Sequence, residues 1–83
     1  MSAVDLGQQF ASRVDQHGYL RLTAKQVAFM RSLALQEMRR NGDDADVRAY
    51  RHHGAPTIVG YLPDGRQWTI AIYQNGAGVF HFS

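Results

Sequence analysis

The sequence predicts an α+β fold in which two N-terminal helices pack on one face of an antiparallel β-meander of three or four strands. Two observations lead to this prediction. Helix caps and helical periodicity occupy residues 1–42, whereas from residue 43 apolar and polar residues alternate between hairpin-turn signals. A chain of 83 residues has room for one core, so we expect a helical half (1–42) and a sheet half (43–83) within a single domain, 1–83.

The first predicted helix begins after Ser2, a good N-cap, and ends at His17-Gly18, where glycine can take the left-handed conformation. One apolar stripe recurs along it at intervals of four residues: Leu6, Phe10 and Val14. Residues 19–22 are interpreted as a short connection, so that the two helices would form an αα-hairpin.

The second predicted helix begins at a capping box, Thr23-Ala24-Lys25-Gln26, and ends at Asn41-Gly42. Its main apolar arc comprises Val27, Ala28, Met30, Ala34, Leu35 and Met38. Phe29 and Leu33 lie nearly opposite this arc. Either these two side chains receive the first helix while the arc packs on the sheet, or they are exposed and form a docking patch.

Alternating residues predict four strands, of which the first is the least well marked, over 46–52, 57–62, 66–74 and 77–83. Pro63-Asp64-Gly65 has the composition of a tight turn, and Asn75-Gly76 is a strong hairpin signal. In the first strand, Val47, Ala49 and Arg51 should share one face, and Arg48, Tyr50 and His52 the other.

The register of the last hairpin decides which face of the sheet is exposed. With a two-residue loop at Asn75-Gly76, Ile72 would oppose Val79 and Ile70 would oppose His81. The long helix would then cover the face with Trp68, Ile70, Ile72 and Val79. The uncovered face would show Tyr73, Phe80 and Phe82. A longer loop would shift the register and exchange the two faces.

Composition gives no support for catalysis. The chain has no cysteine, and adjacent His52 and His53 on a strand would point to opposite faces, so no metal site is expected. The serines lie in no nucleophile motif and the single glutamate, Glu37, lies in mid-helix. Asn75-Gly76-Ala77-Gly78 lies between strands and is not a phosphate loop. We therefore predict a non-enzymatic protein without catalytic residues or cofactors.

Two binding surfaces are predicted instead. A basic-aromatic strand could contact nucleic acid through stacking and phosphate contacts, although the net charge is only +2. A loop of three carboxylates beside an aromatic sheet face would suit a protein partner. The predicted partner-binding residues are Asp43, Asp44, Asp46, Arg48, Tyr50, Arg51, His52, Tyr73, Phe80 and Phe82.

The cellular setting is predicted from what the chain lacks. No stretch is apolar enough for a membrane span and no leader pattern is seen, so a cytoplasmic protein is the expectation. A small domain without disulfides often gains stability by association, so a homodimer is a further expectation.

Part of the helical half resembles a motif of other proteins. Residues 10–37, with Gly18-x-Leu20-x-Leu22-Thr23-x-Lys25-Gln26 leading into an apolar helix, are similar to a helix–turn–helix stretch of small phage-encoded proteins. As a small, cysteine-free α+β chain with an acidic loop, the sequence also resembles the anti-CRISPR class. The net positive charge departs from the strongly acidic, DNA-mimicking members of that class.

The resemblance implies a phage-type inhibitor in the host bacterial cytoplasm, which would occlude a surface of a host defence protein such as a subunit of a CRISPR–Cas complex. The alternative is a small nucleic-acid-binding domain that uses the basic-aromatic strand. A structural or dimeric phage component is a third reading.

Overall fold

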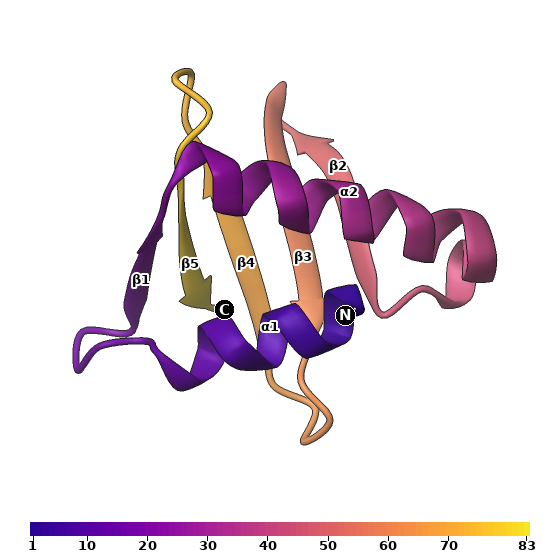
Figure 1. The fold of residues 1–83 in the computed structure, drawn as a ribbon, viewed down its shortest axis with the longest axis horizontal. Coiled ribbons are helices and arrows are strands. Elements are labelled where there is room, and N and C mark those ends of the chain that lie inside the picture. Colours follow the sequence, from indigo (N-terminus) through magenta and orange to yellow (C-terminus); the bar gives the residue numbers. More distant parts are fainter.

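Two helices lie side by side across one face of a five-stranded antiparallel sheet in the computed structural model, which describes residues 1–83 (Figure 1). The helices are α1 (Ala3–Ser12) and α2 (Ala24–Asn41), followed by a short 3-10 turn, η1 (Gly42–Asp44). The strands are β1 (Tyr19–Leu22), β2 (Val47–His52), β3 (Ala55–Tyr61), β4 (Gln67–Ile72) and β5 (Gly78–Phe82). Neither helix is long and apolar enough to cross a membrane.

The sheet order is β1-β5-β4-β3-β2, which places the segment expected to be a connection at one edge of the sheet. β1 pairs with β5, with Tyr19 opposite His81 and Leu22 opposite Gly78. The predicted αα-hairpin is therefore wrong, because the chain passes through this edge strand between the two helices. The four predicted strands are present close to their expected bounds. The Tyr-Leu-Arg-Leu segment alternates as a strand does, but it is too short to be recognised without its partner.

The first helix is shorter than predicted and ends at Ser12. Asp15 Oδ1 accepts hydrogen bonds from the backbone N–H groups of His17 (2.8 Å) and Tyr19 (3.2 Å). This side-chain turn competes with helix continuation. Gly18 does adopt a positive φ of 87°, but within this turn and not at a helix C-terminus.

The second helix has the predicted ends. Thr23 and Gln26 form the reciprocal capping box, with distances of 3.2 and 2.8 Å, and the helix ends at Asn41 before Gly42. The two side chains opposite the main arc differ from each other. Leu33 belongs to the buried core, whereas Phe29 is 49% exposed.

The β4–β5 hairpin does not have the two-residue register. The Tyr73 N–H donates to the Ala77 carbonyl at 2.8 Å, so the loop is Gln74-Asn75-Gly76, with Gly76 at a φ of 89°. This loop is the three-residue type that ends in a left-handed residue. Ile70 is consequently opposite Phe80, and Ala71 is opposite Val79.

The shifted register corrects the predicted exposure of two aromatic residues. Phe80 faces the helices and is completely buried. Phe82 lies on the same side, opposite Trp68, and is half-buried against the core. Val79 and His81 take the uncovered face instead, because a one-residue shift moves every side chain of a strand to the other face.

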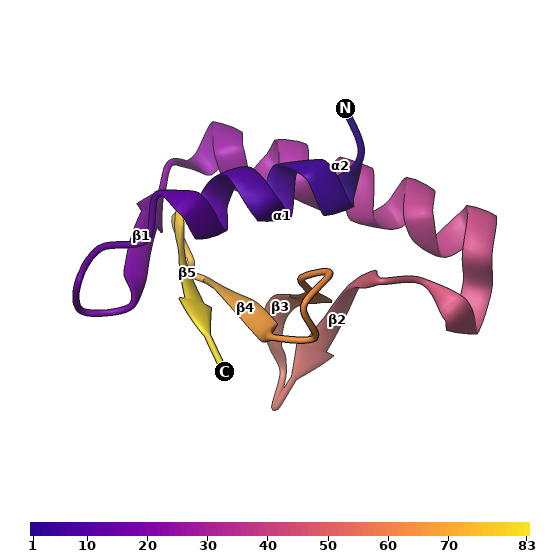
Figure 2. The ribbon, with the colours of Figure 1, turned by 90° about the horizontal axis from the view of Figure 1, so that it is seen from below.

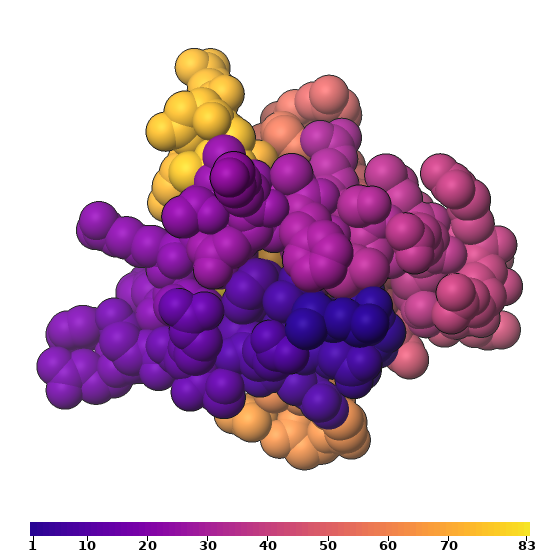
Figure 3. Space-filling model, viewed as in Figure 1, coloured from indigo at the N-terminus to yellow at the C-terminus, as the bar shows by residue number.

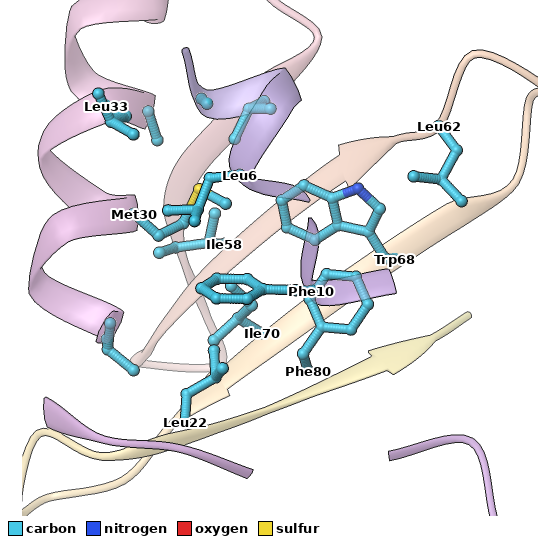
Figure 4. Packing of buried hydrophobic residues seen from close by; sticks show 14 residues of the cluster. Leu6, Phe10, Leu22, Met30, Leu33, Ile58, Leu62, Trp68, Ile70 and Phe80 are labelled. Carbon is cyan, nitrogen blue, oxygen red and sulfur yellow. The ribbon is translucent and has the colours of Figure 1, made fainter. Parts of the chain in front are cut away.

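Trp68 lies at the centre of the core, between α1 and β3 (Figure 4). Its ring stacks on Phe80 with 5.0 Å between centroids, and Phe10 meets Phe80 edge-on at 5.9 Å. A Cβ atom would lie 2.8 Å from the indole at Gly7 and 2.2 Å from it at Gly60. Both glycines are therefore needed for space, although neither has a positive φ.

The corrected register makes a prediction for Phe80. Truncating this buried ring in Phe80→Ala should lower the free energy of unfolding by about 3–5 kcal/mol, whereas Phe29→Ala, on the exposed helix face, should cost less than about 1 kcal/mol. Urea denaturation followed by circular dichroism measures both, and Phe80→Leu provides a milder variant if the alanine form does not fold. Equal losses at the two positions would contradict the register.

The Trp68 packing makes a second prediction. Alanine favours a helix over glycine by about 1 kcal/mol, yet Gly7→Ala should destabilise the protein because the new methyl group meets the indole. A net loss of roughly 1 kcal/mol is expected. In a Trp68→Phe background, where the ring is smaller, the same substitution should become stabilising. An increase in stability in the wild-type background would show that the space is not limiting.

Candidate binding surface

The side of the sheet opposite the helices is uncovered along all five strands, and we call it the open face (Figure 2). In contrast, the helices cover most of the other side (Figure 3). Strand pairing and alternation place the following residues on the open face: Tyr19, Arg21, Arg48, Tyr50, His52, Thr57, Val59, Tyr61, Thr69, Ala71, Val79 and His81.

All four tyrosines of the chain lie on or beside the open face. Tyr19 and Tyr50 are on the two edge strands, Tyr61 is at the end of β3, and Tyr73 follows β4. Each is between 43% and 55% exposed. The middle of the face carries smaller, less exposed side chains: Thr57, Val59, Thr69, Ala71 and Val79. The open face is therefore a floor of small residues with phenol rings around its perimeter.

Cationic groups accompany the tyrosines. Arg21 on β1 makes no ion pair, because the two salt bridges in the structure are Arg48–Asp43 (3.5 Å) and Arg66–Asp64 (2.8 Å). The Arg48 guanidinium also donates to the Gly42 carbonyl at 2.7 Å. Arg21 is thus an arginine of the open face whose guanidinium has no ion pair.

The predicted carboxylate loop lies at the β2 end of the sheet. Asp43 and Asp44 are in η1 and Asp46 directly precedes β2, all three exposed. Asp43 partly neutralises Arg48, although an exposed pair of this kind contributes little stability, about 0–1 kcal/mol. Asp44 and Asp46 form no ion pair.

The structure places the predicted partner-binding residues on both sides of the sheet. Arg48, Tyr50, His52 and Tyr73 lie on the open face or at its edge. Arg51 lies on the helix side of β2, where its guanidinium donates to the Gly54 carbonyl at 2.9 Å. Phe80 and Phe82 belong to the helix side and do not contribute to the open face.

Four aromatic or charged residues of the open face are not among the predicted partner-binding residues: Tyr19, Arg21, Tyr61 and His81. Tyr19 and Arg21 are absent from the predicted set because residues 19–22 are expected to form a connection. The polar-apolar alternation of Tyr-Leu-Arg-Leu was the available signal. His81 was assigned to the wrong face together with Phe80, by the same one-residue error of register.

One end of the open face is hollowed. The hollow has a volume of ≈ 570 Å³ and lies next to β1 and β5, beside the turn formed by residues 15–18. Its lining is Asp15, His17, Tyr19, Arg21, Tyr73 and Val79, and we call it the Tyr19–Tyr73 hollow. The backbone N–H of Tyr19, followed by that of His17, lowers the pKa of the Asp15 carboxyl by hydrogen bonding to its charged form. Asp15 therefore carries its negative charge at neutral pH.

The two adjacent histidines do not behave as neighbours on a strand. His53 lies outside β2 with a φ of 51°, so its ring meets that of His52 with 4.3 Å between centroids. The prediction that they point to opposite faces is wrong, because the strand ends at His52. No group of three or more histidine, aspartate or glutamate side chains is placed to hold a metal ion.

Comparison with known proteins identifies no relative: no family model, curated protein or solved structure matches the chain.

The turn at Asp15 yields a prediction about pH. Because the pKa of Asp15 is lower in the folded chain than its ordinary value of 3.8, its stabilising effect is complete well above that value and is lost as the pH falls below 3.8 and through the lower pKa of the folded chain. Asp15→Asn should lower the Tm slightly at pH 7, and the difference from wild type should shrink steadily as the pH is lowered below 3.8. Asp44→Asn, at a carboxylate without hydrogen bonds, is the control. A Tm difference that persists unchanged in acid would refute the assignment.

Proposed function

We propose that this chain is a non-enzymatic binding protein and that the open face of its sheet engages a macromolecule. The observation that carries the proposal is the placement of all four tyrosines, exposed, around one uncovered sheet face. A fold of this size has other positions for these residues, yet the helix-covered side contains none of them.

The physical basis of the proposal is the small loss of side-chain entropy when tyrosines bind a partner. A tyrosine offers a large amphipathic surface with only two side-chain torsions to immobilise, and here each one is anchored on or next to a hydrogen-bonded strand. Less conformational entropy is therefore lost on association than with flexible side chains. The small residues in the middle of the open face would allow a partner to approach the backbone closely.

A protein partner is the first candidate. Tyrosine and arginine are the residue types most enriched among energetically dominant interface positions. The exposed Asp44 and Asp46 carboxylates could meet lysine or arginine at the β2 end of the open face. A phage-type inhibitor that occludes a host defence protein, such as a subunit of a CRISPR–Cas effector, is the form of this function that we propose. The inhibitor would act in the cytoplasm of the host bacterial cell.

Nucleic acid is the second candidate, and Arg21 is the observation that favours it. This guanidinium has no ion pair and lies between exposed phenol rings, in the hollow that Tyr19 and Tyr73 line. Aromatic side chains that stack on bases, beside arginines that contact phosphates, are a common means of binding single strands on sheets.

The proposal predicts what happens when all four tyrosines are replaced together. A variant with serine in place of all four tyrosines should lose binding to its partner, at least tenfold, while its Tm stays close to that of wild type. The partner is sought both among labelled oligonucleotides and by capture from bacterial lysate. The matched control is Phe29→Ser with Leu35→Ser, which removes exposed apolar groups from the helix side and should leave binding intact.

The opposite pattern would overturn the proposal. If the control variant lost binding while the serine variant retained it, the binding surface would be the helix layer and not the open face.

A further inference from the structure

We propose that the Tyr19–Tyr73 hollow binds one unpaired base of a single-stranded nucleic acid, with a preference for cytosine over uracil. This inference rests on the proposed function and takes its second candidate, nucleic acid, as the partner of the open face. It rests on the geometry and charge of the six residues that line the hollow.

The two phenol rings supply the stacking surfaces. Tyr19 on β1 is 53% exposed, Tyr73 directly after β4 is 55% exposed, and both line the hollow. Its volume of ≈ 570 Å³ is sufficient for a nucleoside with its solvation water. A duplex would not present the face of a base to these rings, because its bases are stacked on one another. An unpaired base can reach them.

The charges of the hollow fit a nucleotide better than a neutral apolar ligand. Arg21 has no ion pair and offers its guanidinium to a phosphate, with which arginine forms paired hydrogen bonds. His17 also lines the hollow and contributes a further ring nitrogen. The apolar part of the lining is limited to the two tyrosines and Val79. An arginine beside aromatic rings suits the phosphate and the base of a single strand.

Asp15 gives the hollow its preference between bases. Its Oδ1 is occupied by the backbone N–H groups of His17 and Tyr19, whereas Oδ2 accepts no hydrogen bond. An ionised carboxylate accepts hydrogen bonds but cannot donate them. Oδ2 can therefore receive the amino group at position 4 of cytosine, but it repels the carbonyl oxygen at the same position of uracil.

The test is fluorescence anisotropy with short labelled single strands of cytidylate and uridylate and with a duplex of mixed sequence, at about 50 and 200 mM salt. We expect micromolar binding of the cytidylate strand that weakens with salt, and weaker binding of the uridylate strand and of the duplex. Tyr73→Ala should weaken binding roughly tenfold, whereas Tyr73→Phe, which keeps the ring, should not.

Two further variants test the polar groups. Arg21→Gln should reduce the slope of log affinity against log salt by about one phosphate contact, while Arg66→Gln, at a guanidinium paired with Asp64, should leave it unchanged. Asp15→Asn should keep the turn through its amide oxygen and turn an amino group towards the base. It should therefore reverse the preference, so that the uridylate strand binds better.

Several results would overturn the inference. These are the absence of oligonucleotide binding at 50 mM salt, tighter binding of the duplex, equal loss in Tyr73→Ala and Tyr73→Phe, or a cytosine preference unaffected by Asp15→Asn. If oligonucleotides fail to bind but a captured protein is lost in the four-serine variant, the inference fails and the proposed function stands. If the four-serine variant retains every interaction, both fail.

Discussion

The insertion of the Trp68 indole between two glycines is the contact on which this fold depends. The ring occupies the space that Cβ atoms would take at Gly7 in α1 and Gly60 in β3, so the helix can approach the sheet closely only while both positions remain glycine. Phe80 then stacks on the indole, and Phe10 packs against Phe80. The indole Nε1 has no protein hydrogen-bond partner, which offsets part of the gain by about 1–3 kcal/mol. A ring this well packed tolerates that loss.

This packing also explains why one side of the sheet is left uncovered. The buried cluster of 14 residues draws on both helices and on all five strands, so the large apolar side chains of the chain are largely used on one side. The other side retains small residues in its middle and phenol rings at its edges. A sheet with one solvated face is ordinary for an antiparallel architecture. The concentration of every tyrosine on that face is what distinguishes this one.

The predicted partner-binding residues and the open face overlap in β2 and differ at the other end of the sheet. Arg48, Tyr50 and His52 share one face of β2 as predicted, because alternation along one strand needs no information from its neighbours. Phe80 was misassigned because Asn75-Gly76 is compatible with two loop lengths, and the choice between them reverses the faces of β5. Burial of the Phe80 ring against Trp68 selects the longer loop, since the shorter one would expose that ring and place His81 in the core.

The sequence by itself determined the class of the fold, the bounds and caps of α2, and the positions of the four strands from β2 to β5. These features depend on interactions within a few residues, such as the reciprocal bonds of Thr23 and Gln26. Only the tertiary structure decided that residues 19–22 form a strand and which aromatic side chains face the solvent. Both outcomes require β5: it supplies the backbone partners of β1, and its register sets the exposed face. A strand of four residues shows too little alternation to identify it, and nothing local names its distant hydrogen-bond partners, so the pairing is decided only when the core is packed.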